Sequence, residues 1–320
     1  MVIGGDTTKI EIRGNAGISR AKSLLNRGFG VERGGKIVLH PVEVAYLACN
    51  PSYSVYEGGK KLELEDVFRW CFSNRENVLL FFVYRDLRDR GRRVRIQGNR
   101  IVEKKVYLPV SERDILRFSE FSLKSGLKPD ILAVVDEEGD VTYYRLWKWD
   151  ETGEQEGEPE PFTGVFAGDR VVTNCMHVFE RFFYGSMSKG LVTLSLVEAV
   201  YLSERGILSL DVSGEELLRE AKRVEENFEE RYRVYRDLKS RKFVVKTGFK
   251  FGSDFRVYDR VESVRDLPHS KYLIKVAEEM RASEMASHAR VASTVRKKMV
   301  FCYFNSEGRP EYICFERVKV

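Results

Sequence analysis

The chain has 320 residues, of which 43% are hydrophobic and 32% charged, with only 8 prolines; this composition excludes a disordered protein and is typical of a globular one with about two domains. The formal net charge is +5, but residues 239–320 carry 18 Lys and Arg against 10 Asp and Glu, so we expect a polyanionic partner at this basic end. Five scattered cysteines without a CxxC pair indicate neither a disulfide framework nor a zinc site. Because the sequence has no run of 18 apolar residues and no secretory signal, we expect a soluble, cytoplasmic protein without a membrane partner.

Taken in chain order, segments of the first half of the sequence return in the second half in the same order. LHPVEVAYL returns as LSLVEAVYL, with five identities in nine residues, and VYRDL returns unchanged. The last recurring segment reads in both halves as an apolar strand, a turn and a second strand, which predicts a β-hairpin. This ordered recurrence predicts an internal duplication. The recurring pairs are 39–47 with 194–202, 83–87 with 234–238, 107–111 with 266–270, and 128–146 with 297–315.

Between the two copies lies the stretch DETGEQEGEPEP, residues 150–161, which holds six acids in its first eleven residues and no base. Its Pro and Gly residues oppose both helix and strand, so it is predicted to be a linker. We therefore expect a mixed α/β fold in which each copy is a small N-terminal α/β subdomain followed by a mixed-sheet, nuclease-like C-terminal subdomain. The predicted divisions are a degenerate, non-catalytic copy at 1–149, a linker at 150–168 and a catalytic copy at 169–320, itself divided into 169–242 and 243–320.

The second copy holds ionisable residues at positions where the aligned first copy has none. His269 lies in a loop before a helical run, where a histidine is suited to proton transfer, although such a histidine more often caps a helix. In the LP-x-S alignment Val110 replaces His269, and Asn99 stands opposite Tyr258. Lys297 ends a predicted helix that runs into the strand 299–304, and a solvated lysine at a helix end is the plain alternative.

These segments resemble the archaeal tRNA-splicing endonucleases. The resemblance lies in VYRDLKSRKFVVKTGFKFGSDFRVY, LPHSKYL, VRKKMVF and YICFERVKV and extends over essentially the whole chain, including the first copy. It implies a catalytic set of Tyr258, His269 and Lys297. Tyr258 would be the general base on a ribose 2′-OH, His269 the general acid toward the leaving 5′-oxygen, and Lys297 the cation beside the phosphorane.

The resemblance also implies residues that bind RNA and residues that assemble the enzyme. Arg290 and Arg317 would clamp a bulged base between their guanidinium planes. The acidic turn of Asp136, Glu137, Glu138 and Asp140 would dock on a basic surface of a partner in a homodimer. Without the resemblance, Arg317 reads as an exposed strand residue and the acidic turn as a solvated one.

The resemblance implies a reaction as well as a site. The substrate would be a precursor tRNA containing a bulge-helix-bulge, a short helix flanked by two three-nucleotide bulges. Because the RNA 2′-OH is an internal nucleophile, cleavage would need no metal and no cofactor, and the products would carry a 2′,3′-cyclic phosphate and a 5′-OH.

Two alternatives remain open at the level of sequence. A non-catalytic RNA-binding or scaffold subunit would share the fold, but the joint presence of Tyr258, His269 and Lys297 argues against it. A metal-dependent DNA nuclease would need clustered carboxylates beside a lysine, and that pattern is not evident near these residues. Dependence on a divalent metal would separate the second alternative from the main hypothesis.

Overall fold

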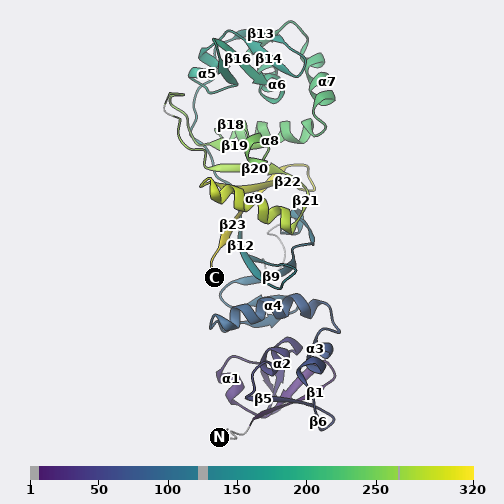
Figure 1. Cartoon of the computed structure of the whole chain (residues 1–320). Coiled ribbons are helices and arrows are strands. Elements are labelled where there is room, and N and C mark those ends of the chain that lie inside the picture. The colour runs from purple at the N-terminus through teal and green to yellow at the C-terminus, as the bar shows by residue number, and fades with distance from the viewer. Residues whose placement is uncertain (1–6, 122–128, 266) are drawn as a thin grey trace.

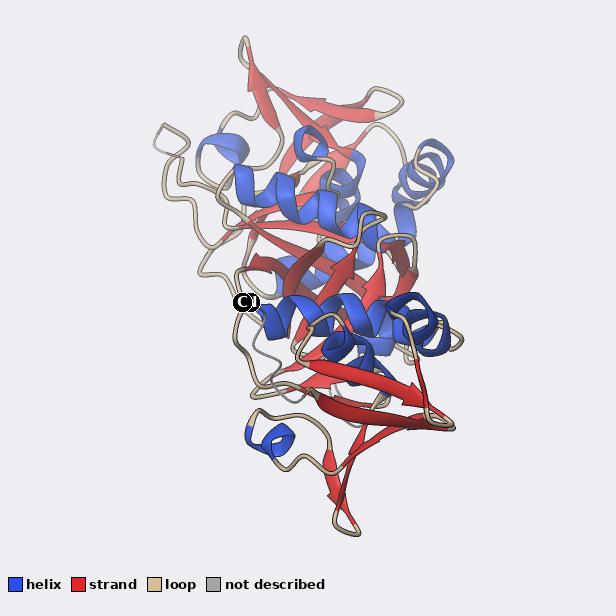
Figure 2. Cartoon of the chain, turned by 60° about the horizontal axis from the view of Figure 1, so that its bottom comes forward, coloured by secondary structure: helices blue, strands red, loops and turns tan. Residues whose placement is uncertain are grey.

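The computed structural model describes residues 7–121, 129–265 and 267–320. Lys128 and Asp266, with which two of the recurring segments begin, lie outside these ranges. In the described ranges the fold is mixed α/β, as predicted, and each copy consists of a small sheet with helices followed by strands of one long shared sheet. The two small sheets lie at opposite ends of an elongated molecule (Figure 1), and layers of strands alternate with layers of helices along it (Figure 2).

The N-terminal unit of the first copy is a sheet with the strand order β3-β4-β2-β1-β5-β6, packed against α1 to α3. Strands β1 and β5 run parallel, and α2 is the connection that crosses between them. Its elements are β1 (Thr8–Arg13), β2 (Ala16–Ser19), α1 (Ser23–Asn26), β3 (Val31–Arg33), β4 (Lys36–Leu39), α2 (Pro41–Ala48), β5 (Tyr53–Glu57), β6 (Lys60–Lys61) and α3 (Leu64–Cys71).

The N-terminal unit of the second copy repeats this arrangement with the order β15-β16-β14-β13-β17, again with a parallel pair, β13 and β17. Strand β13 begins at Phe162, inside the predicted linker 150–168, so the irregular linker covers only 150–161. The elements are β13 (Phe162–Phe166), β14 (Arg170–Thr173), α5 (His177–Glu180), β15 (Ser186–Ser188), β16 (Leu191–Ser195), α6 (Leu196–Glu204), β17 (Leu208–Leu210) and α7 (Gly214–Val224).

The recurring LxxVE segment is explained by a helix cap that both copies share. Glu43 and Glu198 are the third residues of α2 and α6, and each accepts a hydrogen bond from the backbone N–H of its N-cap residue. Each carboxylate also accepts the N–H of a glycine, Gly30 at 3.0 Å and Gly185 at 2.9 Å. Both glycines have a positive φ and lie in close contact with backbone carbonyls, where a Cβ does not fit. Glycine and glutamate therefore recur together.

The C-terminal halves of both copies form one sheet with the order β18-β19-β20-β22-β23-β12-β11-β9-β8-β7. Helices α4 and α8 cover one face of it, and α9 covers the other. The first copy contributes α4 (Glu76–Asp89), β7 (Arg95–Gln97), β8 (Arg100–Val102), β9 (Val106–Ser111), β10 (Ile115–Arg117), the 3₁₀ helix η1 (Phe118–Phe121), β11 (Ile131–Val135) and β12 (Val141–Lys148). The second contributes α8 (Phe228–Ser240), β18 (Val244–Thr247), the 3₁₀ helix η2 (Phe249–Phe251), β19 (Phe255–Tyr258), β20 (Tyr272–Val276), β21 (Glu279–Arg281), α9 (Ala282–Thr294), β22 (Lys298–Phe304) and β23 (Pro310–Val318).

Strands β12 and β23 join the two copies in the middle of this sheet. They are antiparallel, and Leu146 faces Phe315, its own counterpart in the alignment of the two hairpins. A pairing of equivalent residues is what a two-fold axis between the copies requires. The hairpin alignment and the internal duplication are thus confirmed by the strand register.

The alignment of the two LP-x-S segments, in contrast, is wrong. Residues 108–111 lie inside β9, where Tyr107 pairs with Ile131. Residues 267–270 precede β20, and the residue that pairs with Val300, the counterpart of Ile131, is Ile274. The first copy connects β8 to β9 through residues 103–105 alone, whereas the second copy connects β19 to β20 through residues 259–271. Val110 is therefore not the replacement of His269: the first copy lacks the long loop that carries His269.

Candidate active site

The topology of the long sheet brings the three predicted catalytic residues to one edge. Strands β20 and β22 run parallel, so their first residues lie side by side, and β19 is antiparallel to β20, so its last residue lies at the same edge. Tyr258 is that last residue of β19, His269 lies in the loop before β20, and Lys297 directly precedes β22.

Lys297 is held at the end of α9 by its backbone and by its side chain. Its N–H donates to the carbonyl of Ala292 at 2.8 Å, after Arg296 has turned the chain through a positive φ of 55°. Its Nζ donates to the carbonyl oxygen of Ser270 at 2.9 Å and lies 5.8 Å from the ring centroid of Phe251. Lys297 is thus tied to the residue that follows His269.

His269 is exposed on a loop whose two ends are fixed. The N–H of Lys271 donates to the carbonyl of Val257 at 3.0 Å, and the Lys271 ammonium pairs with Asp259 at the other end. The acidic linker also holds the loop, because the N–H of Glu154 donates to the carbonyl of Asp259 at 2.8 Å. The loop extends to the side of the sheet near α5 (Figure 1). A histidine in this position is accessible to a large substrate.

Tyr258 is buried, with 5% of its surface exposed, against the N-terminal unit of its own copy. Its ring lies edge-to-face on Phe183, with the centroids 5.7 Å apart, and both belong to a small apolar cluster with Val244 and Val261. Phe183 has a positive φ of 58°, which is unusual for an aromatic residue. The N-terminal unit therefore takes part in positioning Tyr258.

Arg256 is a site residue that the sequence analysis missed. It lies two residues before Tyr258, on the same face of β19, with its Cζ 5.9 Å from the Tyr258 ring centroid. Its Nε is buried without a hydrogen-bond partner among the described residues. Burial and the positive charge of Arg256 together lower the pKa of Lys297. The spacing of two residues in FRVY was the available sequence signal.

Arg290 and Arg317, the two predicted base-clamping residues, are both exposed, and both lie near Tyr144. Arg290 lies on α9, and Arg317 lies on β23 opposite Tyr144 of β12. Burial raises the pKa of Tyr144, and the charges of Arg317 and Arg290 both oppose that rise. The two guanidinium groups, 27 positions apart in sequence, are therefore near the same hydroxyl.

The predicted acidic turn joins β11 to β12, and hydrogen bonds to the side chain of its first residue, Asp136, stabilise it. The Asp136 carboxylate accepts the N–H groups of Glu138 at 3.0 Å and Asp140 at 2.9 Å, and Glu137 pairs with Arg113 at 2.8 Å. In the second copy, Asn305 accepts the N–H groups at the same two places, from Glu307 and Arg309. The two turns therefore share one geometry but differ in charge, and all four acidic side chains of the first are exposed.

The described ranges of the chain contain no group of three or more His, Cys, Asp and Glu side chains placed to hold a metal ion. None of their helices combines the length and apolar character needed to cross a bilayer. All five cysteines are free thiols.

Comparisons with known proteins place the chain in a family. The model for the tRNA intron endonuclease N-terminal domain matches residues 162–222, and the model for the catalytic C-terminal domain matches residues 228–312. These ranges meet at the break between α7 and α8 and together cover most of the second copy, including Tyr258, His269 and Lys297.

Full-length relatives extend the likeness to the first copy. The tRNA-splicing endonuclease of Methanosarcina acetivorans is 35% identical over 344 aligned positions, which span 95% of this chain and 97% of the relative. That of Methanosarcina mazei is 34% identical over 98% of this chain and 99% of the relative, and that of Haloarcula marismortui is 32% identical over 94% and 95%. Identity at this level over nearly the whole length of each protein shows that the chain belongs to the tRNA-splicing endonuclease family.

Proposed function

We propose that the chain excises introns from precursor tRNA by cutting both bulges of a bulge-helix-bulge. The reaction would take place in the cytoplasm, a reducing compartment in which five free thiols are stable. The observation that carries the proposal is the meeting of Tyr258, the His269 loop and Lys297 at one edge of the long sheet, in the copy that the catalytic-domain model matches.

The chemistry that we propose uses only these side chains and the RNA. Tyr258 takes the proton of the 2′-OH, whose oxygen then attacks the adjacent phosphorus. His269 protonates the departing 5′-oxygen as the P–O5′ bond breaks, and Lys297 stabilises the charge that develops on the phosphoryl oxygens. The products are a 2′,3′-cyclic phosphate and a 5′-OH. Because the nucleophile is already part of the substrate, neither a metal nor a cofactor is required for its activation.

Substrate recognition is assigned to the exposed arginines. Arg290 and Arg317 would stack on a base that is displaced from a bulge, since guanidinium planes stack well on unpaired bases. Their closeness to Tyr144 supports a joint role.

Assembly is assigned to the acidic turn of the first copy, which would dock on a basic surface of a second chain. The resulting homodimer would present two catalytic copies to the two bulges, and two-fold symmetry would match the two cleavage sites. The ordered, exposed carboxylates of residues 136–140 support this assignment. The first copy would then serve assembly rather than catalysis, in agreement with its short connection at residues 103–105.

The proposal can be tested with a labelled bulge-helix-bulge RNA in excess EDTA, comparing the wild type with His269→Ala. We expect two cuts, cyclic-phosphate and 5′-OH ends, and a large loss of rate in the variant. His40→Ala is a matched control, because it also removes one imidazole but lies at the start of α2 in the first copy.

The two alternatives predict different results in the same experiment. Tight binding without cleavage by the wild type would indicate a scaffold subunit. Cleavage that needs added Mg²⁺ would contradict the Tyr, His and Lys mechanism and favour a metal-dependent nuclease.

A further inference from the structure

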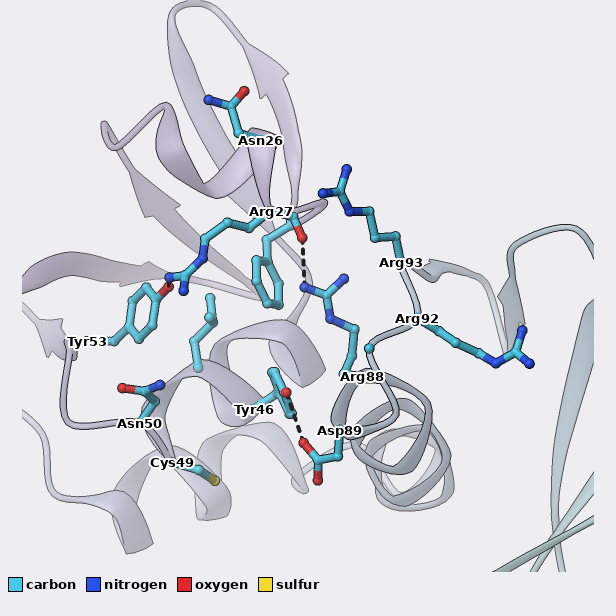
Figure 3. A pocket seen from close by; sticks show the side chains of 13 residues that line it. Asn26, Arg27, Tyr46, Cys49, Asn50, Tyr53, Arg88, Asp89, Arg92 and Arg93 are labelled. Carbon is cyan, nitrogen blue, oxygen red and sulfur yellow. Dashed lines mark hydrogen bonds between the residues drawn. The ribbon is translucent and has the colours of Figure 1, made fainter. Parts of the chain in front are cut away.

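The first copy contains a basic cavity of about 510 Å³ between its N-terminal unit and the end of α4. The elements that line it, among them α1, α2 and the end of α4, lie toward the end of the molecule away from β19 and β20 (Figure 1). We call it the arginine pocket and define it by Arg27, Phe29, Tyr46, Asn50, Arg88 and Arg93, which line it (Figure 3). The catalytic residues proposed above take no part in it, so it requires an explanation of its own.

Arg88 lies at the centre of the arginine pocket and is fixed there. Its Nη2 donates to the carbonyl oxygen of Arg27 at 2.8 Å (Figure 3), and its Cζ lies 3.8 Å from the ring centroid of Phe29. Its Nη1 is buried and has no hydrogen-bond partner among the described residues. This fixed guanidinium adds a permanent positive charge to the wall of the pocket, and such a charge attracts an oxyanion.

Two further arginines add positive charge around Arg88. Arg27 donates from Nη1 to the hydroxyl of Tyr53, and the exposed Arg93 extends from the segment after α4 (Figure 3). Two acids partly offset this charge: Asp89 accepts the Tyr46 hydroxyl at 3.0 Å, and the buried Glu43 lies close enough for the charge of Arg88 to oppose the rise in pKa that burial causes. A fourth arginine, Arg92, points away and pairs with Glu103 at 3.0 Å.

The second copy shows what occupies the equivalent place there. The VYRDL alignment makes Arg88 and Gly91 equivalent to Lys239 and Lys242, and the alignment of α2 with α6 makes Asn50 equivalent to Arg205. The acidic linker contacts Lys242 and Arg205, and its Glu158 lies near enough to Lys239 to affect its pKa.

Gln155 and Glu158 of the linker make these contacts. The N–H of Gln155 donates to the carbonyl of Lys242 at 2.9 Å, and the Glu158 carboxylate pairs with Arg205. Burial lowers the pKa of Lys239 to about 8, and the charge of Glu158 is among those that oppose this decrease. An acidic segment of the chain thus lies along the second-copy counterpart of the arginine pocket.

At two further positions of the pocket, the first copy has arginine where the second copy has an apolar residue. Counting along the same alignments, Arg27 takes the place of Phe182, and Arg93 takes the place of Val244. Phe182 and Val244 are buried, with 7% and 1% of their surface exposed, whereas Arg93 is exposed. Phe182, which lies beside Gly157 of the linker, and Val244, which packs in the cluster with Tyr258, thus have arginines at the arginine pocket as their first-copy counterparts. The occupant should therefore be an extended chain with more negative charge than the linker.

We propose that the arginine pocket binds the phosphate backbone of the precursor RNA outside the cleaved junctions. This inference rests on the proposed function, which supplies RNA as the substrate. A phosphodiester carries one charge per nucleotide, and guanidinium forks match its oxygens. Phe29 and Tyr53 are at most 9% exposed, and the half-buried Tyr46 has one ring face stacked on Phe29. The pocket therefore offers mainly guanidinium groups rather than free ring faces, which favours backbone contacts over base stacking.

The test compares a full precursor tRNA with a short bulge-helix-bulge RNA, using Arg27→Ala/Arg93→Ala and a matched control. Arg69→Ala/Arg117→Ala removes the same charge from exposed positions of the first copy outside the pocket. Dissociation constants are measured over a range of salt concentrations, and cleavage of the short RNA is measured in parallel. Circular dichroism verifies that each variant is folded.

We expect the pocket variant to bind the full precursor about tenfold more weakly, since charge-assisted contacts are lost. The slope of log K against log salt should decrease by roughly 0.7 to 0.9 for each phosphate contact removed. Binding and cleavage of the short RNA, and all properties of the control, should match the wild type.

Three results would overturn the inference while leaving the proposed function intact, provided that the wild type still cuts the short RNA. The first is an equal loss of precursor affinity in the control. The second is a change in oligomeric state of the pocket variant without a change in RNA binding. The third is binding of the peptide DETGEQEGEPEP that depends on Arg27 and Arg93 while precursor affinity is unchanged, which would make the pocket a peptide site.

Discussion

The Lys297 ammonium donates a 2.9 Å hydrogen bond to the carbonyl oxygen of Ser270, the residue after His269. One interaction thus connects the end of α9 to the loop that carries the proposed general acid. Because Ser270 is buried and Lys271 pairs with β19 through its backbone, the loop end cannot move without breaking this bond. Lys297 therefore has a positioning effect as well as a charge.

Replacing Lys297 by alanine should lower kcat by about 100-fold or more, since a cation aimed at developing charge is typically worth that much. The adjacent Lys298→Ala is the matched control, because Lys298 is exposed and lies 5.5 Å from the Trp147 ring centroid, not at Ser270. Single-turnover cleavage of the short RNA gives the rates. If Lys297→Ala and Lys298→Ala cut equally fast, Lys297 has no role in the reaction.

Tyr258→Phe should remove activity without loss of stability. The ring would keep its contact with Phe183 in the buried cluster, whereas the proton acceptor would be absent. Loss of a general base typically costs about 10²- to 10⁴-fold in rate. Thermal unfolding and cleavage are measured on the same preparation. A variant that retains near wild-type kcat would show that another group removes the 2′-OH proton.

The sequence was sufficient to predict those features that depend on short stretches of chain. The hairpins 128–146 and 297–315 share a strand, a turn of equal length and a second strand, and their register confirms the alignment within the described residues. The paired glycine and glutamate of each N-terminal unit also recur as local cap interactions. Duplication and fold class were therefore accessible from self-similarity alone.

Features that depend on pairing between distant strands were not accessible in this way. The letters LP-x-S coincide, yet one segment lies in β9 and the other before β20, because strand register is decided by partners far along the chain. The position of Tyr144 near Arg290 and Arg317 follows from the same long-range pairing, whereas Arg256 beside Tyr258 was accessible from their spacing of two residues within one strand. The roles of the predicted catalytic residues remain predictions.

The pH dependence of cleavage should respond to Arg256. Burial and Arg256 lower the pKa of Lys297, and protonated Lys297 is the active form in our mechanism, so activity falls as pH rises through that pKa. Arg256→Gln removes a nearby positive charge, so the pKa of Lys297 should rise and the alkaline limb should move to higher pH. Arg260→Gln, at an exposed position, is the control. A limb that stays in place, or moves to lower pH, would contradict this assignment.

A buried ion pair fastens the N-terminal unit of the second copy to its catalytic sheet. Lys246 Nζ lies 3.0 Å from Glu198 Oε1, and both side chains are at most 7% exposed. Lys246→Met would leave the carboxylate buried without its cation, at a cost of about 3 to 5 kcal/mol in the free energy of unfolding. Chemical denaturation measures this cost, with the exposed Lys250→Met as control.

The same pair gives a pH dependence of definite sign. Burial acts to raise the pKa of Glu198, but the charge of Lys246 and hydrogen bonds from Gly185 and Ser195 leave it below the ordinary 4.5. The pair's contribution is then present above pH 4.5 and is lost as pH falls through the folded-state pKa. Without Lys246, burial raises the pKa of Glu198 in the variant. The difference in unfolding free energy between wild type and Lys246→Met should therefore begin to shrink as pH falls through that raised pKa, above 4.5, and should be lost below the folded-state pKa of the wild type. A difference that is constant from pH 7 to pH 3 would show that the pair is not the cause.

The two hairpin turns provide an internal control for the proposed dimer. Glu138 and Glu307 occupy equivalent places, each donating its N–H to the first residue of its turn, Asp136 or Asn305. If the first-copy turn docks on a basic surface, Glu138→Lys should weaken the dimer by at least tenfold, since a like charge is then placed against the partner. Glu307→Lys makes the same exchange in the turn that lacks the acidic cluster and should leave the dimer unchanged. Sedimentation at several protein concentrations measures both constants, and low salt should enlarge the difference because the contact is electrostatic. Equal dimerisation of both variants would mean that the chains associate through another surface.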